Sequence, residues 1–574
     1  MNDLQTRIPR FFSELRRRKV IRVMIAYAVG AYVTTEVSNE VLPLLGIPES
    51  VNRIILIILL LGFPVALALA WAFDITPRGI ERTTERSAAG QASGVNTAVS
   101  TTEPEVAAAA ARASPPAGAI AALPFTNLSG DPAQDYLSDG LTEELILALS
   151  RVHGLRVAAR TSCFALKRAT LDVQEIGRRL NVGHVVDGGV RVAGNRIVLS
   201  AQLVDTTTGY VVWTESYERD LGDIFAMQRE LARAIVDRVA GDAASPLEPV
   251  RPPTLNVEAF KLYLRGRYHW NRRTETDLRR AIEFFEQAIV RDRSYAIAWA
   301  GLADAYSLLV DYGGMSGLEG LDHARDAAER ALRMDPTLAE AYTSLALVRQ
   351  FEWRWADAEA AFRRSIALRP EYSVAYQRYS LLLAWLRRSD EAIRTARHAE
   401  SLDPLAVFVA ASTGWVLYYT RRFQEANEQL VRALEMDPHF AAARVPLGLT
   451  HLQLGSIDDA VDHLAQAVTD SGRAASALAL HAHALGLAGD HEAGREIIAE
   501  LEAKAKQEYV SSYYLALPHI ALNEHDTALD RLETALEQER AAQLAYLGAE
   551  PLLDPLRDSA RFRALLERTG LTGG

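Results

Sequence analysis

A repeat of 34 residues in the C-terminal half of the chain constrains the fold more than any other feature. Proline and alanine recur at this interval, the proline within the segments RMDP, ALRP, SLDP and EMDP: Pro336, Pro370, Pro404, Pro438, Ala358, Ala392, Ala426 and Ala460. The period is that of tetratricopeptide repeats, in which each unit is a pair of helices and the proline ends the second helix. No unit buries its apolar face alone, so we expect residues 255–574 to form an all-α superhelix.

The repeat also predicts how the helices pack. Small residues occupy one position of each first helix and allow it to approach the second: Ala346, Ser380, Gly414 and Gly448. A unit at 296–336 carries extra residues around DYGGMSGLEG, and looser units begin at Val257 and continue from Ala475 to about 540. We expect the first helices to form a concave surface, where partners of such arrays usually bind.

One position on that surface predicts a binding groove. It holds aromatic side chains at the repeat interval, followed by a glutamine, with one further ring adjacent: Phe351, Trp385, Tyr419, Gln453 and Tyr418. We expect these rings to face the solvent near the end of each first helix and to bind an extended peptide or a partner helix. The alternative is that the rings fill gaps between units.

The longest apolar run of the sequence predicts a membrane anchor within residues 1–83. Residues 54–73 are twenty positions without a charge, the length that crosses a bilayer as a helix. The preceding apolar segment carries Glu36, Asn39 and Glu40 on one helical face, so it is either a second span or an amphipathic helix in the interface. Basic residues flank both ends, which favours a two-helix hairpin in the bacterial inner membrane with the rest of the chain in the cytoplasm. A single span places the rest in the periplasm.

Residues 84–118, rich in Ala, Ser, Thr, Gly and Pro, are predicted to be a flexible linker. From 119 to 241 the pattern is mixed α/β. AIAALPF and LRVAA are typical of buried strands, DVQEIGRRL of a helix, and three alternating segments between 184 and 220 of an antiparallel meander. An amphipathic helix, DIFAMQRELARAIVDRVA, closes this domain, and residues 242–254 link it to the repeats.

Five segments in this region carry a resemblance to a known family: AALPFTNLSGDPAQDYLSDGLTEELILALSR, LRVAARTSCFALK, VQEIGRRLNVGHVVDGGVR, AQLVDTTTGYVVWTESYERD and DIFAMQRELARAIV. Residues 119–241 resemble the FlgO/TolB-N-like domain. The resemblance implies a sensory or assembly module between a membrane anchor and tetratricopeptide repeats. Some relatives carry a winged-helix or adenylate cyclase domain before the anchor. Only about twenty residues precede the first apolar segment here, so we expect neither.

Acidic residues recur every four positions in the first resembling segment: Asp131, Asp135, Asp139 and Glu143. Gly130 and Pro132 interrupt the helix that this spacing requires, so we expect a turn and a helix entry rather than one stripe. Acidic groups at a helix N-terminus cap free amides. The alternative is a ligand or partner site at Asp131, Asp135 and Asp139, at the end of the first strand.

Chemistry-bearing motifs are sparse. The sequence has no GxxxxGK[ST], GxSxG, HExxH or strand-following GxGxxG, and we expect no enzyme activity, cofactor or metal site. Cys163, the single cysteine, is predicted to be a packing residue, and His481 and His483 to point to different sides of a helix. The net charge of −11 argues against a nucleic-acid partner.

Taken together, the sequence predicts a multidomain protein with N-terminal transmembrane helices, an α/β domain and a tetratricopeptide superhelix. The expected function is that of a membrane-anchored scaffold or sensor that binds protein partners through its repeats. The alternative is a small-ligand receptor for envelope signalling, with its pocket in the α/β domain. An enzyme is the third class that we consider.

Overall fold

The computed structural model of the chain describes residues 118–152, 154–167, 171–239 and 254–571, together with the backbone of two short strands. These strands, β1 (Phe73–Thr76) and β2 (Gly79–Arg82), pair antiparallel. The predicted membrane segments lie outside the described residues, apart from Phe73, which begins β1. None of the helices described combines the length and the apolar character that a membrane span requires. The chain divides into compact units at 1–102 and 103–574, and the second holds both large domains.

The first domain of this unit is built on a six-stranded sheet, in the order β5-β3-β6-β7-β8, with β4 beside β6. Its strands are β3 (Ala119–Ala122), β4 (Thr126–Asn127), β5 (Arg156–Val157), β6 (His184–Ala193), β7 (Arg196–Asp205) and β8 (Val211–Asp220). Its helices are η1 (Pro132–Gln134), α5 (Asp135–Ser150), α6 (Arg160–Ala165), α7 (Val173–Leu180), η2 (Leu221–Asp223) and α8 (Ile224–Val239). The α/β pattern predicted from the sequence is therefore confirmed for this domain.

The antiparallel meander predicted between residues 184 and 220 is present in the structure. Strands β6, β7 and β8 run antiparallel, whereas β3 is parallel to both β5 and β6. Gly194 and Gly209 take left-handed conformations in the two connecting turns, with φ of 59° and 76°. In the second turn the carboxylate of Asp205 accepts hydrogen bonds from the backbone N–H groups of Thr207 and Thr208, both at 2.8 Å.

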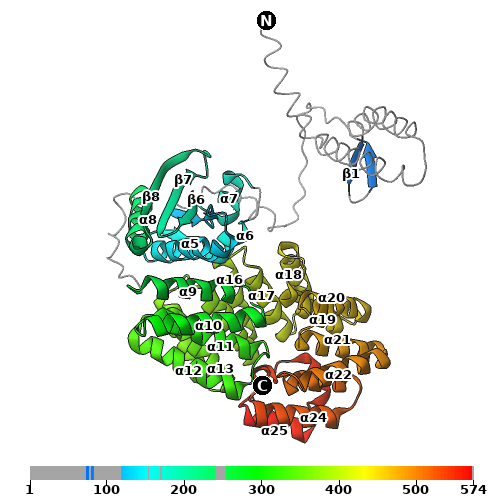
Figure 1. The fold of residues 1–574 in the computed structure, drawn as a ribbon. Helices are drawn as coiled ribbons and strands as arrows, with labels where there is room; N and C mark the ends of the chain where they lie inside the picture. The colour runs from blue at the N-terminus through cyan, green and yellow to red at the C-terminus, as the bar shows by residue number, and fades with distance from the viewer. Residues whose placement is uncertain are drawn as a thin grey trace, which may run out of the picture. The chain divides into compact units, whose positions relative to one another are not determined.

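The second domain is the predicted helical array (Figure 1). The described helices α9 to α24 make eight consecutive pairs: α9 (Val257–Trp270), α10 (Glu275–Arg291), α11 (Ala296–Asp311), α12 (Gly317–Met334), α13 (Ala339–Phe351), α14 (Trp355–Leu368), α15 (Ser373–Trp385), α16 (Ser389–Leu402), α17 (Val407–Tyr419), α18 (Phe423–Met436), α19 (Ala441–Leu454), α20 (Ile457–Asp470), α21 (Ala475–Ala488), α22 (His491–Ala505), α23 (Ser512–Ala521) and α24 (His525–Thr534). Each repeat proline lies between the second helix of one pair and the first helix of the next. The chain contains a tetratricopeptide repeat array.

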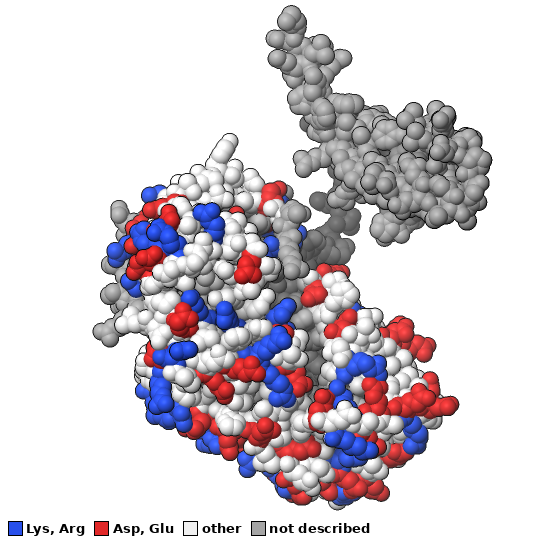
Figure 2. All heavy atoms as spheres, viewed as in Figure 1, with Lys and Arg blue, Asp and Glu red and all other residues white. Residues whose placement is uncertain are grey.

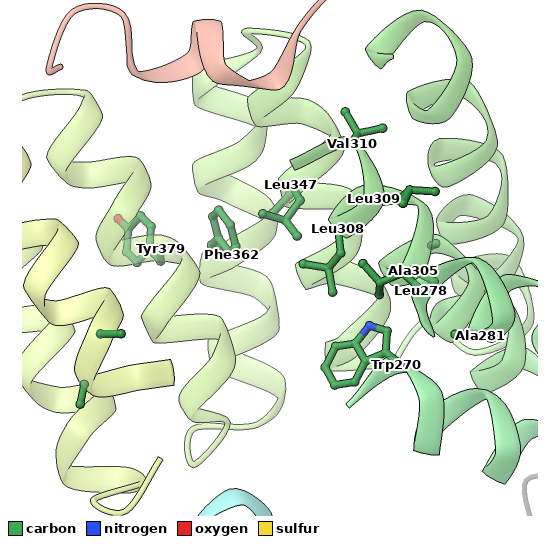
Figure 3. Packing of buried hydrophobic residues seen from close by; sticks show 14 of the residues in the cluster. Trp270, Leu278, Ala281, Ala305, Leu308, Leu309, Val310, Leu347, Phe362 and Tyr379 are labelled. Atoms are coloured by element: carbon green, nitrogen blue, oxygen red, sulfur yellow. The ribbon is translucent and has the colours of Figure 1, made fainter. Parts of the chain in front are cut away.

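The packing inside each pair follows from the small residues of the repeat. The recurrent alanines, such as Ala358 and Ala392, are fully buried. A β-carbon added at Gly414 would lie 2.3 Å from Cδ2 of Leu430, and one added at Gly448 would lie 2.7 Å from Cγ of Leu464. Larger side chains would therefore separate the two helices. Figure 3 shows part of the resulting core, with Leu308 from α11, Leu347 from α13, Phe362 from α14 and Tyr379 from α15.

The chain leaves the repeat pattern after α24, close to the predicted limit near 540. A π-helical turn η4 (Ala535–Glu539) is followed by two 3-10 helices, η5 (Ala542–Tyr546) and η6 (Pro551–Leu556), and by α25 (Ala560–Arg568). This segment returns to much earlier units: Nε2 of Gln543 donates to the carbonyl oxygen of Asp311 at 3.0 Å, and Nε1 of Trp355 donates to that of Thr569 at 3.0 Å. Figure 3 shows the C-terminal ribbon, in faint red, crossing above the helices that carry Leu347 and Val310.

Candidate partner-binding cavity

A cavity of about 1410 Å³ lies against the first helices of successive pairs. Its lining includes Val374, Arg378, Leu381, Phe408, Ser412, Trp415, Val445, Leu449, Ser476 and Leu480, from α15, α17, α19 and α21. The prediction that first helices form the concave surface of the array is therefore confirmed. We call this space the concave cavity.

The lining positions follow the same 34-residue register as the repeat. Leu381, Trp415 and Leu449 are equivalent positions of α15, α17 and α19, and all three line the cavity. On α17, Phe408 and Trp415 are seven residues apart and so share one helical face. Both rings are half-buried. The sequence pattern alone did not point to this lining, although the repeat register contains Leu381, Trp415 and Leu449 one helical turn before the predicted aromatic row.

The predicted aromatic row is buried in the structure. The exposed fractions of Phe351, Trp385, Tyr418 and Tyr419 are 1, 6, 0 and 8%, and Gln453 is half-buried. The expectation that these rings face the solvent is therefore wrong. The reason is tertiary: the ring of Tyr546, from η5, lies 5.4 Å from that of Trp385 and 5.5 Å from that of Tyr419. The repeat pattern alone does not predict that Tyr546 covers these rings.

Most charged groups of the cavity wall are paired. Arg378 contacts Asp311 at 3.0 Å, and Arg369 pairs with Glu340. Arg273, at a left-handed position (φ 59°) between α9 and α10, differs: its guanidinium lies 3.9 Å from the ring centroid of Trp270 and 5.7 Å from that of Phe408. Among the described residues no carboxylate is within ion-pair distance of it. Burial lowers the pKa of Arg273, while Tyr312 and Asp304 act in the opposite direction.

The α/β domain contributes to the same cavity wall through Ser162. Oδ1 of Asp403 accepts hydrogen bonds from the backbone N and the hydroxyl of Ser162, at 3.0 and 2.5 Å, and that hydroxyl also accepts from the backbone N of Leu405 at 2.9 Å. Asp403 is the aspartate of the repeat segment SLDP. The equivalent Asp335 and Asp437 accept instead from backbone groups two residues ahead, at 2.9 and 3.0 Å. One repeat aspartate is thus used to hold the α/β domain.

A second contact joins the α/β domain to the first repeat helix. Glu143 of α5 pairs with Arg160 at 2.8 Å and with Arg267 of α9 at 2.6 Å. Burial alone raises the pKa of Glu143, but the two guanidinium groups outweigh it and lower that pKa to about 2. The rings of Phe225 in α8 and Phe260 in α9 add an edge-to-face contact between the two domains, with their centroids 4.9 Å apart. The α/β domain is therefore fixed both to α9 and to the turn after α16.

The acidic series in α5 has a structural role in each case. Oδ1 of Asp131 accepts from the backbone N of Ala133 at 2.9 Å, Oδ1 of Asp135 accepts from Asn127 at 2.8 Å, and Asp139 pairs with Lys167. Asp131 lies in the predicted turn, where it caps η1, so the four residues do not form one continuous helical stripe. The placement of Asp135 in the turn is wrong, because Pro132 lies in η1 and α5 begins already at Asp135. The ligand-loop hypothesis stays a prediction.

The remaining candidate groups are packed into the fold. Cys163 is fully buried, as predicted, and burial raises the pKa of its thiol to about 12. His483 is buried in α21 with Nδ1 donating to the carbonyl oxygen of Leu517 at 2.7 Å, whereas His481 is half-buried. In the part of the chain that the structure describes, no three His, Cys, Asp or Glu side chains are grouped as a metal site requires. Figure 2 shows acidic and basic side chains interspersed over the visible face.

Comparison with known proteins relates the chain to two functional classes. Residues 117–234 match the family described as HilA/YgeH-like transcriptional regulator, second domain, over nearly the stretch that resembles the FlgO/TolB-N-like domain. "Putative adenylate cyclase 3" of Rhizobium meliloti is 35% identical over 301 residues, which are 50% of this chain and 44% of that protein. Transcriptional regulator HilA of Salmonella typhimurium is 23% identical over 402 residues, 67% of this chain and 63% of that protein. The chain thus spans less than two thirds of either relative.

Solved structures that resemble parts of the chain include tetratricopeptide repeat proteins. PilW, a type IV pilus biogenesis factor, is 21% identical with a TM-score of 0.30, over 36% of this chain and 92% of PilW. YrrB, a repeat protein with an unusual peptide-binding site, is 22% identical with a TM-score of 0.23, over 32% of this chain and 91% of YrrB. Scores this low carry no argument, and the repeat assignment rests on the helix pairs described above.

The expectation that the chain is not an enzyme is contradicted by the relative named as an adenylate cyclase, which aligns with half of the chain at 35% identity. That expectation rested on the lack of four motifs, those of phosphate loops, dinucleotide-binding loops, a serine nucleophile and a zinc site. A catalytic site can be built from other residues.

Proposed function

We propose that the protein binds a protein partner through the concave cavity, and that the α/β domain is an assembly or sensory module coupled to it. The observation that carries this proposal is the lining of the cavity: two half-buried rings, Phe408 and Trp415, beside an arginine without a carboxylate partner among the described residues, Arg273. Such a wall fits an extended peptide with an apolar side chain next to an acidic one. The hydrogen bonds of Ser162 to Asp403 support the coupling.

A membrane location is part of this proposal and rests on the sequence alone. The twenty uncharged residues 54–73 would anchor the chain in the bacterial inner membrane. The basic flanks favour a cytoplasmic position for both large domains. The test is fractionation of the full-length chain together with an alkaline phosphatase fusion after residue 90. Recovery in the soluble fraction would contradict the anchor, and an active fusion would place the domains in the periplasm.

The binding proposal is tested by in vivo crosslinking and mass spectrometry with the full-length chain. Replacing Phe408 and Trp415 by Ala should abolish the crosslinks of the native protein to its partner, while the melting temperature stays within a few degrees. The matched control is Trp299→Ala, since Trp299 is a half-buried ring on α11 that stacks with Arg330 and lies outside the cavity lining. Equal loss of crosslinks in the double variant and the control would reject the cavity as the binding site.

A second candidate function is adenylate cyclase activity, or regulation of such an activity. It is favoured by the 35% identity with the Rhizobium meliloti protein. The test is the formation of cyclic AMP from ATP and a divalent cation by the purified full-length chain. Formation at a rate above that of a boiled sample would establish the activity. A rate equal to that of the boiled sample would leave the binding proposal as the better account.

A further inference from the structure

We propose that residues 541–556 are an internal ligand of the repeat array, occupying a surface that an external segment of the same chemistry takes in their place. We call these residues the strap. The external segment is a peptide with an aromatic residue followed, four and eight positions later, by carboxylates. This inference rests on the proposed partner binding and adds to it the chemistry of the partner and the competition with the strap.

The strap crosses successive units in chain order, as a bound peptide does. Gln543 contacts the end of α11 through the carbonyl oxygen of Asp311 at 3.0 Å. Further along, Arg387 donates to the carbonyl oxygen of Gly548 at 2.9 Å. Arg421 then makes two hydrogen bonds to the carboxylate of Asp554, at 2.8 and 2.7 Å. The strap therefore advances along the array together with the repeats.

The two arginines that hold the strap are equivalent residues of neighbouring repeats. Arg387 and Arg421 are 34 positions apart and take the same left-handed conformation, with φ of 60° and 61°. Each follows the first helix of its pair, α15 or α17. Stacked repeats place equivalent positions side by side along one surface. The strap is thus recognised by repeat positions rather than by an irregular set of contacts.

An aromatic side chain anchors the strap in a cluster of rings. The ring of Tyr546 lies 5.4 Å from Trp385, 5.5 Å from Tyr419 and 5.6 Å from Tyr513, measured between centroids. Rings at such distances attract one another beyond the effect of burial alone. Tyr546 is itself only half-buried and lines the concave cavity, so one side of this anchor stays open to the cavity.

The acidic positions of the strap match groups on the array. The hydroxyl of Tyr418 donates to Glu550 at 2.6 Å, and Arg421 faces Asp554. Glu550 is buried, with an exposed fraction of 3%. A partner that presents carboxylates at these two places would keep both interactions. The spacing of Tyr546, Glu550 and Asp554 defines the segment that we expect to compete.

The connection between the array and the strap is irregular. The strap follows the π-helical turn η4 and then Arg540, which has a φ of 49°. Both features end the regular geometry of α24. They show how the chain turns out of the repeat pattern before it enters the strap.

The experiment measures binding of a labelled peptide with the sequence of residues 541–557 to the full-length chain by fluorescence anisotropy. The wild-type chain should bind it weakly, since its own strap competes at a high effective concentration. The double variant Tyr546→Ala, Asp554→Ala should bind it at least about tenfold more tightly. Adding Arg421→Glu to the double variant should remove this gain. The control is Arg422→Glu, the next residue, whose partner is Glu425 rather than the strap.

A folded double variant that binds the peptide no better than the wild type would overturn the proposal. If the double variant does not fold, hydrogen exchange of the wild-type chain decides. Strap amides that exchange faster than those of α15 and α17, and faster still with excess peptide, support detachment. Exchange of the strap only together with those helices overturns it. Neither result depends on the native partner, so failure here leaves the crosslinking test of the cavity unaffected.

Discussion

Two rows of residues on the same helices, α15 and α17, differ in what covers them. Trp385 and Tyr419 are buried against Tyr546, whereas Leu381 and Trp415, four residues earlier, are half-buried. Both rows have the same 34-residue period. The difference arises from residues 541–556, which lie outside the repeats. A periodic pattern therefore identifies surfaces that are equivalent within the array, and a segment beyond the array decides which surface is open.

The largest expected effect comes from removing the covered row. Replacing Phe351, Trp385 and Tyr419 together by Ala should unfold the array, because each buried ring contributes about 3–5 kcal/mol when truncated to Ala. Differential scanning calorimetry should show the main transition lost or lowered by tens of degrees. The matching triple replacement in the row that lines the cavity, Leu381, Trp415 and Leu449, provides the comparison. Its two half-buried members should make it the milder of the two, and equal losses would remove the distinction between the rows.

A smaller effect is expected from removing only the cover. Tyr546→Ala deletes the half-buried ring that meets Trp385 and Tyr419 and should cost about 1–3 kcal/mol, less than a fully buried ring. The array should stay folded, and the Trp385 indole should become more accessible. Quenching of tryptophan fluorescence by acrylamide measures this change. Unchanged quenching together with an unchanged melting temperature would show that the strap does not depend on this ring.

The strap should also respond to pH through Glu550. Burial and the neighbouring Asp554 raise the pKa of its carboxyl group, while Tyr418, Leu552 and Arg421 oppose this, and the result is about 7, above the ordinary value of 4.5. The docked strap therefore holds a proton that the detached strap releases. Docking is most stable below about pH 4.5 and loses stability as the pH rises through about 7.

Hydrogen exchange of residues 541–556 at pH 6 and pH 8, corrected for the intrinsic rate, checks this dependence. Protection should fall at the higher pH in the wild type. Glu550→Gln removes the titrating group but keeps a group of similar shape, so protection should then vary little between the two pH values. A wild-type strap that is equally protected at both values would show that Glu550 does not control docking.

The smallest expected effect concerns the exposed end of the strap. Arg421→Ala removes an ion pair with Asp554 whose side chains are 47 and 38% exposed, and such pairs contribute about 0.2–1 kcal/mol. The melting temperature should fall by no more than a few degrees, and less at 1 M NaCl, where screening already weakens the pair. A loss as large as that of Tyr546→Ala would mean that the charged contact rather than the ring anchors the strap.

Local patterns predicted most of the described fold. The proline and alanine positions gave the helix pairs, and alternation with Gly194 and Gly209 at the turns gave the meander. These features depend on neighbours within one repeat or one hairpin, which the sequence displays directly. The start of α5 was misplaced because Pro132 was taken to delay the helix, whereas it occupies a short 3-10 turn that leads into it.

The candidate site was predicted only in part. The sequence identified the helices that carry it, but the row that it selected, with Trp385 and Tyr419, is nearly fully buried and borders the cavity without facing the solvent. The contact of Ser162 with Asp403 joins residues 241 positions apart, and that of Tyr418 with Glu550 spans 132. In neither contact does the sequence around one residue indicate which distant residue it will meet. Each residue is of a common type for its own helix or turn.

The sequence by itself determined the period of the array, the small residues at which its helices cross, the antiparallel meander of the sheet and the uncharged stretch at 54–73. Each of these follows from local spacing and from the chemistry of individual side chains. Only the tertiary structure decided that the strap covers one aromatic row, that Asp403 holds the α/β domain and that Arg273 faces the cavity without a carboxylate partner among the described residues. The burial and the pairing of a side chain depend on which distant segments come into contact. A repeat array has many equivalent surfaces, and its sequence does not say which of them a distant segment covers.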